Sequence, residues 1–247
     1  MFNEFHPDSL IVASDLTCPA MAASGARQRS ISTVVLDVDD TLILTEAACF
    51  SLENEVLSSI GRAPMTRDIH LSTWGMSLLD ALPVRSPGID LAEFSRAYER
   101  TLQSYVESGR LDVLADDNLN VLDQLISDGY SVMLLTSRTE AEIRHLIAPD
   151  HPLTGRIARV YHADNVQQLK PSPRVFDELL ADNRVSPQGC VYVGDSPGDA
   201  AAATGAGLRF IASLQSGIRT RSDFVLYPVD AFVDHFSELI EAIAALP

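Results

Sequence analysis

Five short apolar segments alternate with helical segments along most of the chain. The apolar segments have the length and the Val, Ile and Leu content typical of buried β-strands, and they lie at residues 33–38, 131–136, 158–162, 190–194 and 208–212. Helices are predicted at residues 116–128, 139–147, 173–182 and 198–204. This alternation predicts an α/β fold in which a parallel sheet carries helices on both faces. A short edge strand is expected at residues 223–227, and a closing helix at residues 229–246.

The segment between the first two strands has apolar positions at helical spacing instead. It predicts helices at residues 46–60, 71–82 and 91–106, with breaks at Gly61, Pro83 and Pro87. A small helical module is therefore expected between linkers near Leu44-Thr45 and Asp112-Val113. The predicted organisation is an N-terminal extension (1–30), a core made of residues 31–44 and 113–247, and the helical module (45–112).

The first 30 residues show little periodicity and mix Pro, Ser, Ala and Gly. They have no basic start, and the apolar run at residues 10–13 is too short for a secretory signal. We expect a partly ordered extension; the alternative is a segment that packs on the core or on a partner subunit.

The formal charge of −16 over 247 residues argues against nucleic acid or an anionic membrane as the main partner. No apolar run approaches the roughly 20 residues that span a bilayer. The three cysteines, Cys18, Cys49 and Cys190, are far apart and indicate neither a disulfide framework nor a zinc site. A reducing cytoplasm is therefore the expected location, and no feature indicates an oligomeric state.

The first strand ends in three acidic residues within four positions: Asp37, Asp39 and Asp40. Carboxylates this close repel one another unless a cation or a proton relieves them. Ligands of open α/β sheets bind just outside the carboxyl ends of the strands, so a divalent metal and a substrate are expected here. A polar turn or a helix N-cap is the alternative explanation for these residues taken alone.

Four motifs occur in the same order as in a known superfamily. Asp-x-Asp-x-Thr is matched by Asp37, Asp39 and Thr41, a hydroxyl after a strand by Thr136, a lysine before Pro-x-Pro by Lys170, and Gly-Asp-x-x-x-Asp by Gly194, Asp195 and Asp199. Over residues 33–212 the chain resembles the haloacid dehalogenase-like hydrolase superfamily. The resemblance implies a Rossmann-like parallel sheet core with helices on both faces. The helical module resembles the α-helical cap of the phosphoglycolate phosphatase-like and β-phosphoglucomutase-like branch.

The residues themselves support phosphoryl transfer. A carboxylate attacks a phosphate monoester if a cation neutralises the phosphoryl oxygens, and Mg²⁺ prefers carboxylate and phosphate oxygens. Asp37 is expected to be the nucleophile that forms an aspartyl-phosphate, and Asp39 the general acid and then the general base. The resemblance implies the same roles, with Mg²⁺ held by Asp37, Asp195 and the backbone carbonyl of Asp39. Dehalogenases of the superfamily lack an acid at the position of Asp39, which favours phosphoryl chemistry.

Other residues are expected to assist this chemistry. Thr136 and Ser137 would bind the phosphoryl group, Lys170 would add positive charge and hold Asp37, and Asp199 would support the metal waters or orient Lys170. A solvated surface lysine is the alternative for Lys170, although the chain has few lysines and this one falls in register. Asp40 is interpreted as a turn residue.

The predicted function is a Mg²⁺-dependent phosphatase acting on a small phosphorylated metabolite. The alternatives are a phosphomutase for a sugar phosphate and a non-catalytic member of the same fold. No pattern in the helical module identifies the substrate. Four side chains there or in a loop could reach it, and packing or solvation explains each at least as well: Glu46, Trp74, Arg85 and Arg138.

Overall fold

The computed structural model describes residues 31–74, 78–183 and 185–247. Residues 1–30, for which we expect an N-terminal extension, lie outside the described part of the chain.

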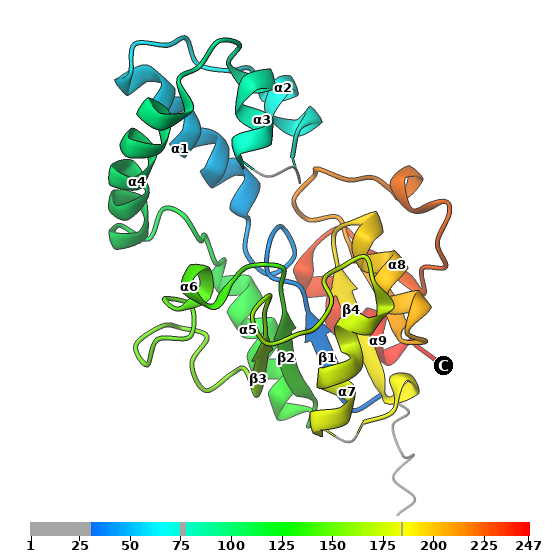
Figure 1. The fold of residues 1–247 in the computed structure, drawn as a ribbon. Coiled ribbons are helices and arrows are strands. Elements are labelled where there is room, and N and C mark those ends of the chain that lie inside the picture. The colour runs from blue at the N-terminus through cyan, green and yellow to red at the C-terminus, as the bar shows by residue number, and fades with distance from the viewer. Residues whose placement is uncertain (1–30, 75–77, 184) are drawn as a thin grey trace, which may run out of the picture.

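One parallel sheet organises the core. Its strands are β1 (Thr33–Leu36), β2 (Ser131–Leu135), β3 (Arg159–Tyr161), β4 (Cys190–Gly194), β5 (Arg209–Ser213) and β6 (Ala231–Val233). Their order across the sheet is β3-β2-β1-β4-β5-β6, and every neighbouring pair is parallel. The chain builds the sheet outward from β1 in one direction, and then returns to its other side with β4 (Figure 1). This reversal of strand order beside β1 is the place where open α/β sheets bind ligands.

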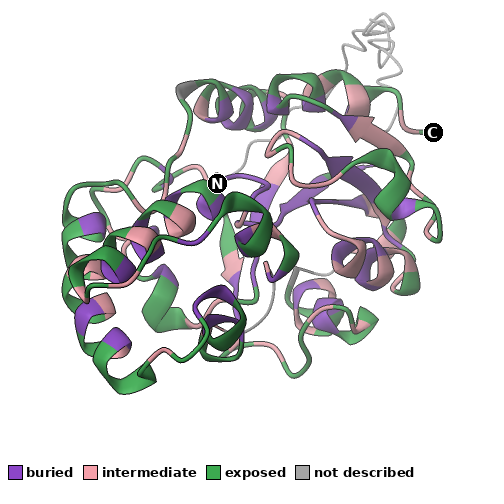
Figure 2. Ribbon diagram, turned by 90° about the horizontal axis from the view of Figure 1, so that it is seen from above, coloured by how far each residue is buried: buried purple, intermediate pink, exposed green. Residues whose placement is uncertain are grey.

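Successive side chains of a strand point to opposite sides of the sheet, and the four central strands, β2, β1, β4 and β5, are largely buried on both sides. Val34 and Leu36 belong to one hydrophobic cluster, together with residues of α5 (Asp116–Ser127) and α9 (Leu239–Ala244). Val35 belongs to the other, with residues of α7 (Asp177–Asn183) and α8 (Pro197–Gly205). Figure 2 shows the strands mostly as buried and the outward faces of the helices as exposed. The predicted parallel sheet with helices on both faces is confirmed.

The helical module consists of α1 (Thr45–Ser59), α2 (Arg67–Ser72), α3 (Leu78–Arg85) and α4 (Leu91–Glu107), which lie together at one side of the core (Figure 1). It has a hydrophobic cluster of its own that includes Leu52, Leu82, Phe94 and Tyr105. The α-helical insertion after β1 is thus confirmed as part of the fold. The boundaries at residues 44/45 and 112/113 stay a prediction, although α1 begins at Thr45.

Several predicted elements differ from the structure. Residues 223–227 do not form a strand, because residues 221–224 form a 3₁₀ turn, and β6 is the edge strand instead. The closing helix expected at residues 229–246 is wrong over its first half, since residues 231–233 pair with the free edge of β5. Helical structure is limited to a 3₁₀ turn at residues 236–238 and to α9. The helix expected at 71–82 is replaced by α2, which ends at Ser72, and α3, which begins at Leu78. The break expected at Pro83 is wrong, because this proline lies inside α3. Residues 140–143 form α6 (Glu140–Ile143), shorter than the expected 139–147.

Among the described residues, no helix is long and apolar enough to cross a lipid bilayer.

The packing of the helical module predicts the effect of truncating Phe94, which is fully buried on α4. Phe94→Ala should lower the free energy of unfolding by about 3–5 kcal/mol, because it leaves a cavity in the cluster of the module. Urea denaturation followed by circular dichroism measures this. Ser104→Ala on the exposed side of the same helix is the control, and equal stability of the two variants would contradict the role of the cluster.

Candidate active site

The strand ends bring the predicted site residues to one edge of the sheet. Asp37 follows β1, Thr136 follows β2 and Asp195 follows β4. Leu36, the last residue of β1, is in register with Leu134 on one side and with Val193 on the other. The three side chains that follow these strands therefore lie at the carboxyl edge, beside the reversal of strand order. All three residues are buried.

A tight turn after β1 separates the three acids. Asp40 has a left-handed backbone (φ 56°), which a short polar side chain tolerates. Its carboxylate accepts the N–H groups of Thr45 and Glu46 at 3.1 and 3.0 Å, at the start of α1, and the indole N–H of Trp74 at 3.0 Å. Burial raises the pKa of Asp40 to about 6, although the Glu46 N–H opposes this. Asp40 is thus a turn residue that also caps α1 and holds Trp74 to the core.

Lys170 is the only lysine in the sequence, and its ammonium lies between two carboxylates. Its Nζ is 2.7 Å from Asp37 Oδ1 and 2.8 Å from Asp199 Oδ1. It also donates to the Tyr192 hydroxyl at 3.2 Å, and this hydroxyl donates to Asp199 at 3.0 Å. Sequence reasoning missed Tyr192, because a tyrosine inside an apolar strand carries no local sign of a polar partner. The alternative of an ordinary solvated Lys170 does not describe this geometry.

The carboxylates differ in how far their charge is compensated. Burial raises the pKa of Asp37 to about 7, although Lys170 opposes this. Burial also raises the pKa of Asp195 well above its usual range, and the charges of Asp199 and Asp37 add to the rise. Asp199 is buried too, but Lys170 and Ser196 bring its pKa below the usual range. Asp37 and Asp195 are therefore the acids that lack sufficient positive charge.

These carboxylates could hold a cation. Oxygen atoms of Asp37, Asp195 and Asp199 all lie within 4.8 Å of one another, and all three residues are buried. Buried carboxylates with uncompensated charge fit a hard divalent cation such as Mg²⁺. Asp199 already accepts from Lys170, Tyr192 and Ser196, which fits a supporting role.

A glycine and a capping box position Asp199. The Asp199 Oδ2 accepts the backbone N–H of Ser196 at 3.0 Å, and the Ser196 hydroxyl accepts the Asp199 N–H at 3.2 Å, at the start of α8. A Cβ at position 194 would lie 2.5 Å from Asp199 Cγ. Glycine is therefore required there for Asp199 to reach Lys170.

Asp39 points to a different partner. Its two carboxylate oxygens accept from Arg138 Nε at 3.1 and 3.0 Å. Arg138 also donates to Asp112 at 2.9 Å and to Thr45 at 3.2 Å, and Asp112 contacts His145. Arg138 thus joins the predicted acid to both connections between the core and the helical module.

The remaining predicted residues occupy varied positions. The Thr136 hydroxyl accepts the N–H of Arg138 at 3.1 Å, while Ser137 is exposed. Two of the candidates for reaching the substrate make buried polar contacts within the helical module: Glu46 Oε1 is 2.6 Å from His70 Nδ1, and Arg85 Nη1 is 2.7 Å from Glu53. Glu46 therefore serves the packing of the module, whereas Arg85 also borders a cavity.

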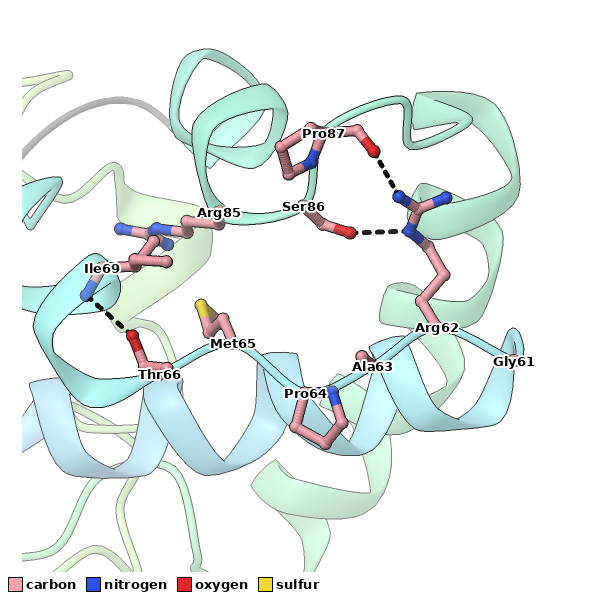
Figure 3. A pocket seen from close by; sticks show the side chains of 10 residues that line it. All are labelled: Gly61, Arg62, Ala63, Pro64, Met65, Thr66, Ile69, Arg85, Ser86 and Pro87. Carbon is pink, nitrogen blue, oxygen red and sulfur yellow. Dashed lines mark hydrogen bonds between the residues drawn. The ribbon is translucent and has the colours of Figure 1, made fainter.

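Two of the cavities that the described residues form border the helical module. The larger, of about 960 Å³, lies between the module and the core and is lined by residues that include Asp39, Arg138, Trp74 and Arg85. The smaller, of about 400 Å³, lies within the module, where Arg62 donates to Ser86 and to the carbonyl of Pro87 (Figure 3). None of the residues lining the smaller cavity carries a carboxylate. The larger cavity adjoins the candidate site, because Asp39, the predicted general acid, lines it.

Comparison with known proteins agrees with this geometry. The model of the family described as haloacid dehalogenase-like hydrolase matches residues 34–213. The chain belongs to this family. The match covers all four motifs and the helical module, so the predicted enzyme class, a phosphatase of the haloacid dehalogenase-like superfamily, is confirmed at the level of the family.

Similar proteins support the expected branch of the superfamily. A phosphoglycolate phosphatase from Xylella fastidiosa is 30% identical over 192 residues, which cover 77% of this hydrolase and 83% of that protein. A structure from Thermotoga maritima assigned to β-phosphoglucomutase has a TM-score of 0.71 at 21% identity, over 85% of this chain and 99% of that chain. CbbY from Rhodobacter sphaeroides in complex with phosphate has a TM-score of 0.66 at 23% identity, over 87% and 99%. The two structures show the shared fold.

The close approach at position 194 generates one prediction. Gly194→Ala should lower the free energy of unfolding by about 1–3 kcal/mol, since the added Cβ must displace the anchored Asp199. Thermal unfolding measures the loss. Gly198→Ala is the control, because its Cβ would meet the Ser196 Oγ at 3.5 Å, an ordinary contact. A Gly194→Ala protein as stable as this control would show that Asp199 is not held as described.

A second prediction concerns the reactivity of Lys170. Burial lowers the pKa of this amine, but the charges of Asp199 and Asp37 raise it by more. The pKa of Lys170 therefore lies well above the usual range. Below that pKa the amine stays protonated and unreactive. At pH 9, trinitrobenzenesulfonate should therefore modify Lys170 far more slowly than a free lysine. Asp199→Asn should accelerate the reaction about tenfold or more, because one pKa unit changes the fraction of free amine tenfold.

Mass spectrometry can follow this reaction at a single site, since the chain has no other lysine side chain. Asp182→Asn is the matched control, because Asp182 pairs with the exposed Arg159, whereas Lys170 pairs with Asp37 and Asp199. Modification of the unaltered protein at the rate of free lysine would contradict the buried ion pairs.

Proposed function

We propose that this hydrolase is a Mg²⁺-dependent phosphatase that cleaves small phosphate monoesters through an aspartyl-phosphate on Asp37. The observation that carries the proposal is the placement of a buried carboxylate, Asp37, 2.7 Å from the only lysine and within 4.8 Å of Asp195. Phosphate in the CbbY structure and the names of the relatives support a phosphorylated substrate. The cytoplasmic location expected from the cysteines stays a prediction.

Asp37, Asp195 and the backbone carbonyl of Asp39 would hold the cation. Burial raises the pKa of Asp37 to about 7 despite Lys170, so the nucleophile needs further positive charge to be ionised at neutral pH. When bound, Mg²⁺ supplies this charge and neutralises the phosphoryl oxygens.

In the first step an Asp37 oxygen attacks phosphorus and the bond from phosphorus to the alcohol oxygen breaks. Asp39 donates a proton to the departing oxygen. Lys170 and Thr136 stabilise the charge on the transferring phosphoryl group. The Asp39 carboxylate pairs with Arg138 in the described geometry, so proton donation requires Asp39 to turn away from this guanidinium.

In the second step Asp39 accepts a proton from water as the water oxygen attacks phosphorus. The bond between phosphorus and Asp37 breaks, which releases phosphate, restores the Asp37 carboxylate and returns Asp39 to its protonated form. Asp199 holds Lys170 in place throughout, because its own charge is balanced by Lys170, Ser196 and Tyr192.

The first test is phosphate release from a panel of phosphate monoesters with and without Mg²⁺. Release should depend on Mg²⁺ and should fall at least about a thousandfold in Asp37→Asn, because the nucleophile is lost. Asp123→Asn, which alters an exposed carboxylate paired with Arg156, is the control for the removal of one acidic charge. Release that persists in Asp37→Asn would contradict the nucleophile.

Thermal unfolding separates loss of catalysis from loss of the metal site. Mg²⁺ should raise the melting temperature more at pH 8 than at pH 5, because protons compete for Asp37 and Asp195 at low pH. Asp195→Asn should abolish this shift.

A folded, Mg²⁺-binding protein that releases no phosphate would favour the phosphomutase or the non-catalytic alternative. A mutase would convert a sugar phosphate when a bisphosphate primer is present.

A further inference from the structure

We infer that the substrate is a phosphate monoester of a bulky, uncharged alcohol with an apolar body, and not phosphoglycolate or a bisphosphate. The inference rests on the proposed phosphatase function and specifies its substrate class. It is carried by the cavity of about 960 Å³ between the helical module and the core.

The cavity is where the leaving alcohol must lie. The Asp39 side chain, the proposed proton donor, forms part of its wall, and Arg138 beside it does so too. A general acid must lie within hydrogen-bonding distance of the oxygen that it protonates. The phosphoryl group meets Asp37 and Lys170 at the sheet edge, so the alcohol attached to it extends past Asp39 into the cavity.

Apolar side chains form much of the cavity wall. Tyr98, Leu102 and Val106 lie along one side of α4, and Leu78 comes from α3. On the core side, α6 contributes Ala141. Leu102 and Leu78 are only half-buried, so their surface is free to contact a bound apolar group. Such a wall favours hydrocarbon over hydrated or charged groups.

The buried cations of the wall are already neutralised. Arg85 Nη1 is 2.7 Å from both carboxylate oxygens of Glu53. Arg138 is paired with Asp112 as well as with Asp39, so it keeps a carboxylate partner when Asp39 turns towards the alcohol. Arg144 is 73% exposed and lies 3.9 Å from Glu140. Among the described residues that line the cavity, no buried arginine is therefore left without a carboxylate partner. A second anionic group on the substrate would lose hydration there without gaining an ion pair.

The size of the cavity agrees with its chemistry. Pockets for drug-sized ligands occupy roughly 300–1,000 Å³. The cavity, at about 960 Å³, is near the top of that range. A two-carbon acid such as glycolate would leave most of its apolar wall in contact with water. An alcohol with an aromatic ring or a long alkyl chain would cover that wall.

A series of alkyl phosphates tests the inference, because their leaving alcohols are of similar basicity and only the body changes. The series is ethyl, butyl, hexyl and 2-phenylethyl phosphate, with phosphoglycolate as the charged member. We expect kcat/KM to rise about threefold to fourfold for each methylene that the cavity buries. The 2-phenylethyl ester should exceed phosphoglycolate at least tenfold.

Two matched variants test whether the cavity wall determines the selectivity. Val106→Arg should lower kcat/KM for the 2-phenylethyl ester and raise it for phosphoglycolate, because it adds an unpaired cation to the wall. Val106 is 37% exposed, so the arginine can be accommodated without unfolding. Ser104→Arg, at an exposed position of the same helix outside the cavity lining, should leave the ratio of the two rates unchanged.

The failures of the two proposals are distinguishable. Hydrolysis of phosphoglycolate that equals or exceeds hydrolysis of the longer esters would overturn the inference and leave the phosphatase intact. Absence of release from every ester would overturn the proposed function. Calorimetric dissociation constants of 2-phenylethylphosphonate and phosphonoacetate give a readout that needs no turnover. Tighter binding of phosphonoacetate would also overturn the inference.

Discussion

The buried ion pairs of Lys170 are the interaction on which the rest of the site depends. Its ammonium contacts Asp37 at the end of β1 and Asp199 in the first turn of α8. These elements flank the reversal of strand order, so one side chain joins both halves of the sheet. In a chain of net charge −16 with a single lysine, this cation lets three buried carboxylates lie together. Removal of the lysine would leave these buried carboxylates without a compensating charge, which is strongly destabilising.

A second group of polar contacts joins the core to the helical module. Arg138 binds Asp39 and Asp112, and Asp40 binds the start of α1 and Trp74. The orientation of the proposed acid and the position of the module therefore depend on the same hydrogen bonds. The core supplies the groups that act on phosphorus, while much of the surface offered to the alcohol comes from α3 and α4.

Differences between prediction and structure occur where local pattern is weak. The apolar segment at 231–233 fits a helix or a strand equally well, and the free edge of β5 decides the outcome. Tyr192 reads as one more apolar residue of β4, yet its hydroxyl contacts Lys170 and Asp199. From the sequence, packing or solvation explains Arg138 at least as well as contact with a substrate does. Its carboxylate partners lie 99 and 26 positions away along the chain.

The sequence by itself determined the parallel α/β core, the helical insertion and the acids at the strand ends. These features are local, because a buried strand followed by carboxylates is written in consecutive residues. Only the tertiary structure decided which acids keep uncompensated charge, what holds Asp39, and how apolar the cavity is. These properties depend on contacts such as that between Lys170 and Asp37, 133 positions apart, and on the burial that changes carboxylate pKa values. Periodicity along the chain carries no information about either.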